Sequence, residues 1–472
     1  MGIILPAGFY SDSATKGLRE FFFDTRAIES IYCFENRFPV VFKSVHNQFK
    51  FIVLCIVKDN SNPNIRCAFM QHDPEQLPAI EKRAILLKPE DIVRFSPDSL
   101  SITEFNAQRD IEIAGKIYAD FPLLGNTDAS LPWRFPLLSV EFNMTHQSYM
   151  FKQNVDGYIL YEGKMINQFD NEYSSNNWAI DRAEAENYLR KKEMYRIGMN
   201  SNLGKLISSS NITIPISFSN YRFGVRSIGR RSDERALIST VLPKNVCIGN
   251  SLFTALPWEY LSESRLVNSN NELLKSPYYS YGNLIFVVSL LNSFIYGWLI
   301  GMKISANLNI FILNQLPLPR LSNGNYYYGE ILRRGARLIC TSRDYANLWT
   351  DVYSEWSDPN KTHPIELTNY GPEHEQDIRQ RLAESVANLT SEWTPVCGVH
   401  DRNPNRGDTG DRVQLRAEID AYVAHLFGLT RDEFAYILDT FPVLKRKEEQ
   451  AFGEFMSKRK CLEEYDRIAT IL

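Results

Sequence analysis

The chain has 472 residues, of which 44% are hydrophobic and 12% aromatic, so it is long enough for a substantial core and for more than one domain. Its 52 basic and 56 acidic residues give a net charge of −4, so any nucleic-acid binding would need a local basic face. The seven cysteines include no Cys-x-x-Cys pair, which favours reduced thiols in a cytoplasm over a secreted disulfide framework.

The first segment, residues 2–57, is typical of an α/β domain. The apolar run Ile3–Leu5 predicts a fully buried strand of a parallel sheet. Two further apolar strands are predicted at Ile28–Phe34 and Phe49–Val57. Because such strands need cover on both faces, we expect additional cover and sheet neighbours from elsewhere in the chain or from another polypeptide.

One helix is predicted between the first two strands. The polar residues Ser11–Ser13 provide the chemistry of a helix start. The spacing of the residues that follow places four of them on one side of the helix: Leu18, Phe21, Phe22 and Thr25.

The segment after the third strand, residues 61–120, mixes short strand-like and helix-like pieces and ends in a helix predicted at Ile111–Tyr118. Residues 121–320 form a second region, rich in β-structure. Within it we expect a strand, a glycine turn and a second strand at Gly157–Phe169, and a charged helix at Asp181–Arg196. The apolar run Leu284–Met302 is interrupted by polar residues, which favours a buried strand and helix over a membrane span.

Residues 321–472 are predicted to be mainly helical. Leu415, Ile419, Val423 and Phe427 recur every fourth residue and form one apolar stripe. Thr430 and Glu433 have the spacing of a capping box, which opens the next helix. A single long helix is expected over Val443–Ile468.

Several sequence blocks resemble one protein family. LPAGFYSD, FENR and the F…H…KF pattern within residues 2–57 resemble the last part of the catalytic domain of adenine-specific DNA methyltransferases fused to type IIG restriction enzymes. The resemblance continues through YEGKMINQF, an arginine-rich block and SANLNIF to the C-terminus. It implies an α/β fragment from the end of a class I methyltransferase sheet (1–60), a connector (61–120), an α+β target-recognition domain (121–320) and a mainly α C-terminal domain (321–472).

Two motifs on which the family's methyl transfer depends do not occur in these residues. One is a glycine-containing loop that holds S-adenosylmethionine, and the other is Asn-Pro-Pro-Tyr/Phe, which accepts hydrogen bonds from the target adenine. Asn62-Pro63 and Asn403-Pro404 lack the second proline and the aromatic residue. The resemblance therefore implies that S-adenosylmethionine is bound by a catalytic half outside this chain, which is supplied by a second polypeptide or has been lost through truncation, and that the chain alone does not methylate DNA.

The family stacks an aromatic residue on the adenine that is extruded from the duplex. The matching position is Phe42, with Phe38 as a competing alignment, and Phe42 could instead be core beside Phe49 and Phe51. His46 and Lys50 match the pocket loop of the family, without a catalytic role for His46.

Residues that would contact double-stranded DNA come from three places. Lys164, at the tip of a glycine turn, could reach a phosphate. Five arginines in a predicted strand-turn-helix stretch favour a phosphate clamp that also reads guanine edges over a solvated face: Arg222, Arg226, Arg230, Arg231 and Arg235. Asn307 and Asn309 match an asparagine-bearing turn that binds bases or merely closes the turn.

The resulting hypothesis is a DNA-recognition and base-pocket subunit of a restriction–modification or phage-defence methyltransferase. One alternative is a non-catalytic DNA-binding remnant of a split gene. A third, weaker alternative is a metal-dependent nuclease built on Asp156, Glu162 and Lys164, in which two carboxylates hold magnesium and the lysine polarises a phosphate.

Overall fold

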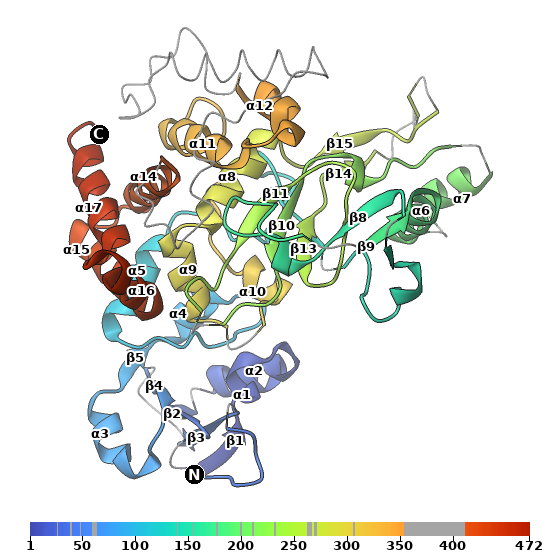
Figure 1. Ribbon diagram of the computed structural model, residues 1–472. Helices are drawn as coiled ribbons and strands as arrows, with labels where there is room; N and C mark the ends of the chain where they lie inside the picture. The colour runs from blue at the N-terminus through green and yellow to red at the C-terminus, as the bar shows by residue number, and fades with distance from the viewer. Residues whose placement is uncertain are drawn as a thin grey trace. The chain divides into compact units, whose positions relative to one another are not determined.

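The computed structural model describes residues 1–25, 27–37, 40–47, 49–58, 64–138, 140–153, 155–175, 178–198, 201–209, 212–230, 233–261, 267–268, 271–304, 307–353 and 411–472. The chain divides into two compact units (Figure 1). Unit 1 comprises Met1–Pro122 with Gln315–Pro317, and unit 2 comprises Leu123–Asn314 with Leu318–Leu472. Phe38 and Arg231 lie outside the described residues.

Unit 1 is built on a five-stranded sheet in the order β1-β3-β2-β4-β5. The strands are β1 (Gly2–Pro6), β2 (Ile28–Glu35), β3 (Lys50–Ile56), β4 (Ile65–Gln71) and β5 (Ile85–Leu87). β3 is antiparallel to β1 and to β2, whereas β2 and β4 are parallel. The strands β1, β2 and β4 therefore run in one direction, and their carboxyl ends lie at the same edge of the sheet.

The prediction of a fully buried parallel strand at Ile3–Leu5 was wrong. β1 lies at the edge of the sheet and is antiparallel to its neighbour β3. Ile4 is 60% exposed, and no described strand pairs with the outer edge of β1. The strand predictions at Ile28–Phe34 and Phe49–Val57 are confirmed by β2 and β3.

Helices α1 (Gly8–Ser11) and α2 (Lys16–Asp24) follow β1. The predicted apolar side of α2 does not face the core, because Leu18 and Phe21 are 47% and 60% exposed. The buried residue of α2 is Arg19. Its guanidinium donates to the carbonyl oxygens of Phe9 in α1 and of Ser99 at 2.7 and 2.5 Å, which ties α2 to α1 and to the segment after α4.

The remaining helices of unit 1 are α3 (Leu77–Lys82), α4 (Pro89–Phe95) and α5 (Gln108–Ile117). α3 covers one face of the sheet, where Ile80 packs into a cluster with Tyr32, Phe34, Phe51 and Ala68. α5 confirms the helix predicted at Ile111–Tyr118.

The described residues of unit 2 form three sheets. The first has the order β11-β10-β13-β6, the second β12-β8-β9-β7, and the third pairs β14 with β15. Their strands are β6 (Leu137–Leu138), β7 (Lys152–Gln153), β8 (Gly157–Tyr161), β9 (Trp178–Asp181), β10 (Arg222–Arg226), β11 (Ser239–Leu242), β12 (Cys247–Ile248), β13 (Leu252–Ala255), β14 (Trp258–Tyr260) and β15 (Lys275–Pro277).

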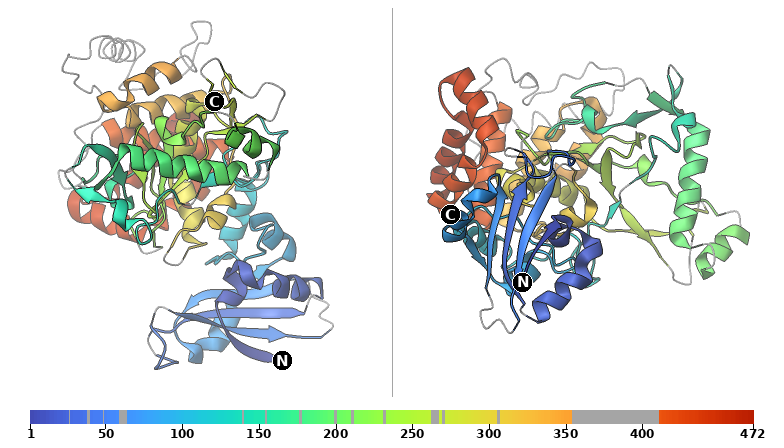
Figure 2. Two further views of the ribbon diagram at one scale, coloured as in Figure 1. Left: turned by 90° about the vertical axis from the view of Figure 1, so that its right-hand side faces the viewer. Right: turned by 90° about the horizontal axis from the view of Figure 1, so that it is seen from below.

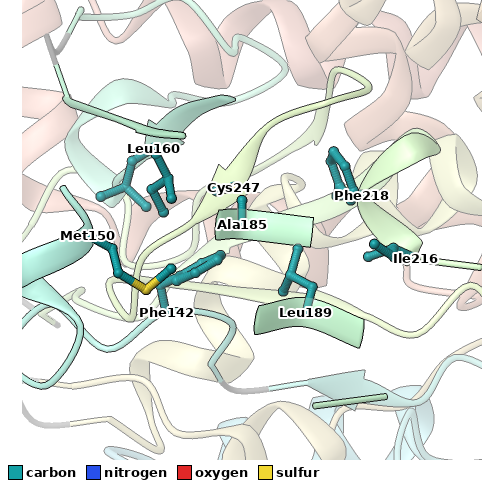
Figure 3. Close-up of a cluster of buried hydrophobic side chains, with 9 residues drawn as sticks. Phe142, Met150, Leu160, Ala185, Leu189, Ile216, Phe218 and Cys247 are labelled. Atoms are coloured by element: carbon teal, nitrogen blue, oxygen red, sulfur yellow. The ribbon is translucent and has the colours of Figure 1, made fainter. Parts of the chain in front are cut away.

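Helix α6 (Arg182–Ile197), which confirms the predicted charged helix, packs on the second sheet. Ala185 and Leu189 of α6 meet Leu160 of β8 and Ile180 of β9 in a buried cluster, part of which Figure 3 shows. The short helix α7 (Asn202–Ser209) follows. The second strand predicted within Gly157–Phe169 is absent from the described structure, because the chain after β8 forms a 3₁₀ turn at Gly163–Met165.

The apolar run predicted as a buried strand and helix forms two buried helices instead, α8 (Tyr281–Leu291) and α9 (Phe294–Gly301). In the part of the chain that the structure describes, no single helix has the length and apolar character needed to cross a membrane. α8 and α9 meet that test only as a pair, with a bend of 63° between them. The short helix α10 (Ile310–Asn314) follows them in the chain.

The C-terminal part of unit 2 is helical, as predicted, through α11 (Tyr326–Ile339), α12 (Ala346–Tyr353), α14 (Asp411–Leu426), α15 (Arg431–Asp439), α16 (Pro442–Phe452) and α17 (Met456–Ala469). The apolar stripe of α14 is buried, and Thr430 and Glu433 form the predicted capping box. The single helix predicted at Val443–Ile468 is broken by Gly453, which adopts a left-handed conformation at the end of α16. Figure 2 shows α14–α17, in red, on the side of unit 2 opposite α6.

Candidate nucleic-acid interface

The turn that carries Lys164 is fixed by a contact with a distant segment. β8 ends at Tyr161, and the backbone N–H of Gly163 donates to the hydroxyl of Ser251 at 2.9 Å. A Cβ atom at position 163 would lie 2.9 Å from the backbone oxygen of Ser251, so this close approach requires glycine. Lys164 projects beside it with a side chain that is 58% exposed, and its Nζ lies 3.2 Å from the carboxylate of Glu162.

Backbone contacts join this turn to two other segments. The carbonyl oxygen of Ser251 accepts from the N–H of Ser227 at 3.0 Å, and the carbonyl oxygen of Ser227 accepts from the N–H of Leu308 at 2.9 Å. Ile228 and Asn307 form an isolated antiparallel bridge. The Lys164 turn, the end of β10 and the 307–309 turn therefore form one surface of unit 2.

We call this surface the polar face. It is defined by four exposed residues that were predicted from the sequence to contact DNA: Lys164, Arg230, Asn307 and Asn309. Arg230 begins a loop two residues after the bridge, where its N–H donates to the carboxylate of Asp233 at 2.9 Å. The backbone oxygen of Asn309 accepts from the N–H of Ile312 at 3.0 Å, so Asn309 closes the turn that starts α10. The side chains of Asn307 and Asn309 are both exposed, which leaves their amides accessible to a ligand.

The prediction that Arg222 contacts DNA is revised, because this side chain is fully buried. Its guanidinium forms an ion pair with Glu141 and donates to the carbonyl oxygen of Val246. Glu141 in turn accepts from the N–H of Ile248 at 3.1 Å. Arg222 therefore joins β10 to the segments around β12 inside the core.

Two more of the predicted arginines are held by internal contacts. Arg226 is half-buried and donates to the carbonyl oxygen of Ile166, so it braces the segment after the Lys164 turn. Arg235 lies over the ring of Phe294, 3.5 Å from its centroid, and faces Asp420 of α14. The predicted helix of this stretch is absent from the described residues, in which β11 is the next element after β10, and the four described arginines do not share one surface. Of the five, Arg230 is the one that the structure describes as exposed.

In unit 1, the loop that carries Phe42 follows the carboxyl end of β2. The side-chain oxygen of Asn36 accepts from the N–H groups of Val41 and Phe42 at 3.1 and 2.9 Å. Its amide nitrogen donates to the carbonyl oxygens of Phe42 and Val45, each at 2.9 Å. Phe42 is 37% exposed and meets Phe51 edge to face, with 5.1 Å between ring centroids. One part of the ring therefore packs on the core, and the rest is accessible to a ligand.

Lys50 and His46 lie close to this loop in the sequence but differ in their contacts. The ammonium of Lys50 forms an ion pair with Glu104 at 2.7 Å, and both side chains are largely buried. The hydroxyl of Tyr10 donates to the same carboxylate at 2.7 Å, and burial, together with Glu104, raises the pKa of Tyr10. Lys50 therefore acts in a buried polar cluster. His46 is exposed, and its ring centroid lies 6.5 Å from that of Phe49.

The residues proposed for a nuclease site make separate contacts. Asp156 is 89% exposed at its side chain and forms an ion pair with Arg182 at 2.9 Å. Glu162 forms an ion pair with Lys164. Within the described ranges, no group of three or more His, Cys, Asp or Glu side chains is placed to hold a metal ion.

Sequence reasoning missed the residues that assemble the polar face. Ser251 and Ser227 join three segments by hydrogen bonds between positions that are far apart in the chain. Ile228, which is 60% exposed beside Asn307, also belongs to this surface. The spacing of these residues carries no pattern, because the contacts exist only once the sheets of unit 2 have formed.

No family model matches the sequence, and neither does any curated protein. Several solved structures are similar at low identity. A Type IIL restriction-modification enzyme, MmeI, in complex with DNA is 10% identical with a TM-score of 0.33, over 94% of this chain and 49% of that chain. The type IIG restriction endonuclease BpuSI is 11% identical with a TM-score of 0.28, over 73% of this chain and 44% of that chain. A DrdV–DNA complex is 11% identical with a TM-score of 0.26, over 100% of this chain and 50% of that chain. The chain spans about half the length of these three solved chains.

Proposed function

We propose that this chain recognises a specific DNA sequence and closes the target-base pocket for adenine-specific methylation in a restriction–modification or phage-defence system. The resemblance of its sequence blocks to type IIG enzymes supports this proposal. The single observation that carries it is the polar face, on which Lys164, Arg230, Asn307 and Asn309 gather from separate segments of unit 2.

The side chains of the polar face suit the two kinds of contact that a DNA reader needs. Lys164 and Arg230 supply positive charge for phosphate oxygens, which positions the protein on the duplex. The amides of Asn307 and Asn309 can donate to and accept from base edges, and asparagine pairs well with adenine in the major groove. Because the net charge of the chain is −4, this local charge has to act against the overall field.

Unit 1 would supply the wall of the base pocket. Extruding a base from the duplex costs a few kcal/mol, and stacking on an aromatic ring recovers part of that cost. Phe42 has an accessible ring and lies on a loop that is held in place by four hydrogen bonds with the side chain of Asn36, two donated and two accepted. A fixed ring loses less entropy when a base binds than a mobile one does.

In this proposal, a second polypeptide carries the catalytic half and binds S-adenosylmethionine, for which these residues contain no glycine loop of the family's type. The outer edge of β1 supports the placement of such a partner. It has no strand partner in the described part of unit 1, and Ile4 beside it is 60% exposed. An open edge of this kind presents backbone groups that pair readily with a strand from another chain.

DNA recognition is tested by selection from a randomised duplex library with the purified full chain. We expect the selected duplex to bind at least about 10³-fold more tightly than a scrambled duplex in fluorescence anisotropy. Equal affinity for the two duplexes, or no binding, would overturn the proposal.

The partner is tested by pull-down of the tagged chain from its native host, followed by mass spectrometry and an adenine-methylation assay on the recovered material. We expect a chain with Asn-Pro-Pro-Tyr/Phe and methylation that requires both polypeptides. If the tagged chain is recovered without a partner and still binds its DNA site, it is the non-catalytic remnant.

A further inference from the structure

A cavity of about 540 Å³ lies along the carboxyl-terminal half of β4 in unit 1. Its volume falls within the range of small-molecule sites. It opens at the end of one of two parallel neighbouring strands, β2 and β4, and ligands of α/β sheets bind beyond the carboxyl ends of such strands. The polar face, in unit 2, does not include any residue of this cavity.

The backbone of β4 is distorted where it forms the cavity wall. Its pairing with β2 shifts register between Tyr32 and Phe34, and Met70 adopts a positive φ of 56°. β5 pairs only with Ile65–Cys67, so residues 68–71 have no strand on that side within unit 1 as described. Bulges and left-handed residues other than glycine are costly, and they concentrate where a strand is reshaped to hold a ligand.

The cavity has an apolar floor and a polar rim. The floor consists of buried side chains: Phe69, Ile80, Ile85 and Phe105. The rim includes the amide side chains of Gln71 and Asn106 and two basic residues, His72 and Arg83. Arg83 donates to the side-chain oxygen of Gln71 at 2.7 Å and has no acidic partner among the described residues. A guanidinium in this position, with free N–H groups, is a ready site for a phosphate.

We propose that this cavity binds a nucleoside monophosphate, with the planar base on the apolar floor and the phosphate on Arg83. The amide nitrogen of Gln71 donates one hydrogen to the carbonyl oxygen of Phe69 at 2.6 Å, and its second N–H can donate to the polar edge of a base. The rim also contains Asp73, whose carboxylate accepts from the N–H of Glu75 at 3.0 Å. Its negative charge, on the same rim as one guanidinium, favours one phosphate over a polyphosphate chain.

Part of the cavity wall is connected through side-chain contacts to the ring of Phe42. Phe42 contacts Phe51, and Phe51 shares a buried cluster with Ala68 and Ile80, which line the cavity. The nucleotide could therefore be a free metabolite or part of a DNA strand. The site does not depend on the proposed function, because a free nucleotide would occupy it whether or not the chain reads DNA.

The test is isothermal titration calorimetry of the full chain with AMP, GMP, CMP and UMP, and with the matching nucleosides and inorganic phosphate. We expect saturable binding of at least one monophosphate and weaker binding of its nucleoside. Arg83→Ala should lower the affinity at least about tenfold, and Arg83→Lys should restore part of it. The matched control is Arg94→Ala, because Arg94 is an exposed arginine of unit 1 that does not line the cavity.

Absence of binding by all four monophosphates would overturn the proposal, as would equal affinity of the wild type and Arg83→Ala. Thermal melting of each variant shows whether it is folded. If the bound monophosphate competes with a single-stranded oligonucleotide that contains the same base, the pocket takes nucleotides of DNA. If the oligonucleotide does not compete, the pocket takes the free nucleotide.

Discussion

Arg222 and Glu141 form an ion pair inside unit 2, with side chains that are 0% and 3% exposed. The pair closes a network, because Arg222 also donates to the carbonyl oxygen of Val246 and Glu141 accepts from the N–H of Ile248. Arg222, the first residue of the densest arginine cluster in the sequence, therefore stabilises the fold. A loss of DNA binding in an Arg222 variant would report unfolding and would say nothing about phosphate contacts.

We expect Arg222→Ala to destabilise the protein by about 3–5 kcal/mol, because it leaves the carboxylate of Glu141 buried without its partner. Urea denaturation followed by circular dichroism measures this change in the free energy of unfolding. Arg230→Ala is the matched control, since Arg230 is exposed and its removal should change stability by less than about 0.5 kcal/mol. Equal stability of the two variants would contradict the buried network.

The polar face makes a separate prediction for DNA binding. Lys164→Ala and Arg230→Ala should each weaken binding and reduce the slope of log K against log salt by about 1, if each side chain neutralises one phosphate. Anisotropy titrations at several salt concentrations provide the slope. Lys445→Ala is the control, because Lys445 on α16 is an exposed lysine that also faces a glutamate but lies outside the polar face. A slope unchanged in both variants would remove Lys164 and Arg230 from the interface.

Local signals in the sequence were sufficient where one residue pattern determines one element. The apolar strands β2 and β3, the buried stripe of α14 and the capping box of Thr430 and Glu433 all follow from spacing and composition. They could be predicted because their cause lies within a few residues of the chain.

The predictions failed where distant segments decide the outcome. The run Ile3–Leu5 is as apolar as a buried strand, yet β1 lies at a sheet edge, since β3 is its one strand partner among the described residues. Arg19 is buried in place of its apolar neighbours, since its guanidinium donates to the backbone carbonyl oxygens of Phe9 and Ser99. Distant partners also decide the positions of two predicted DNA-binding arginines. Arg222 is buried in an ion pair with Glu141, and Arg235 lies over the ring of Phe294.

The Phe42 loop predicts a defect in base handling without a defect in DNA binding. Phe42→Ala removes the stacking face, which is worth about 1–3 kcal/mol for a base, or roughly 5- to 150-fold in affinity for the extruded nucleotide. The readout is the fluorescence of a duplex with 2-aminopurine at the target position, measured with the recovered methyltransferase complex. We expect Phe42→Ala to reduce the 2-aminopurine fluorescence and Phe42→Tyr to keep it. Asn36→Ala should also reduce this fluorescence, because Asn36 holds the loop.

Phe49→Ala is the control for this experiment. Phe49 is 64% exposed and its N–H donates to the carbonyl oxygen of His46 at 3.0 Å, so it belongs to the same loop. Anisotropy with the unmodified duplex should change less than about twofold in all of these variants, since phosphate contacts dominate affinity. A Phe42→Ala complex with normal 2-aminopurine fluorescence would show that Phe42 serves as core packing alone.

The stability of the protein should depend on pH through a buried carboxyl group. The carboxyl of Asp420 in α14 accepts from the N–H of Phe294 at 2.6 Å, and burial raises the pKa of Asp420 to about 7 from an ordinary value of 3.8. The folded protein therefore keeps a proton that the unfolded chain has already released between these two values. Stability contributed by this group should be complete below pH 3.8, fall as the pH rises from about 4 to 7, and change no further above pH 7.

Asp420→Asn keeps an acceptor for the N–H of Phe294 and removes the titration. Urea denaturation from pH 5 to pH 8 should therefore show a smaller loss of stability in the variant than in the wild type. The difference should be about 1.4 kcal/mol for each pH unit between pH 5 and the raised pKa of about 7. Asp439→Asn is the control, because Asp439 is an exposed carboxylate at the end of α15. If the pH profiles of Asp420→Asn and the wild type are parallel, the carboxyl of Asp420 is charged throughout, and Arg235, which it faces, compensates for its burial.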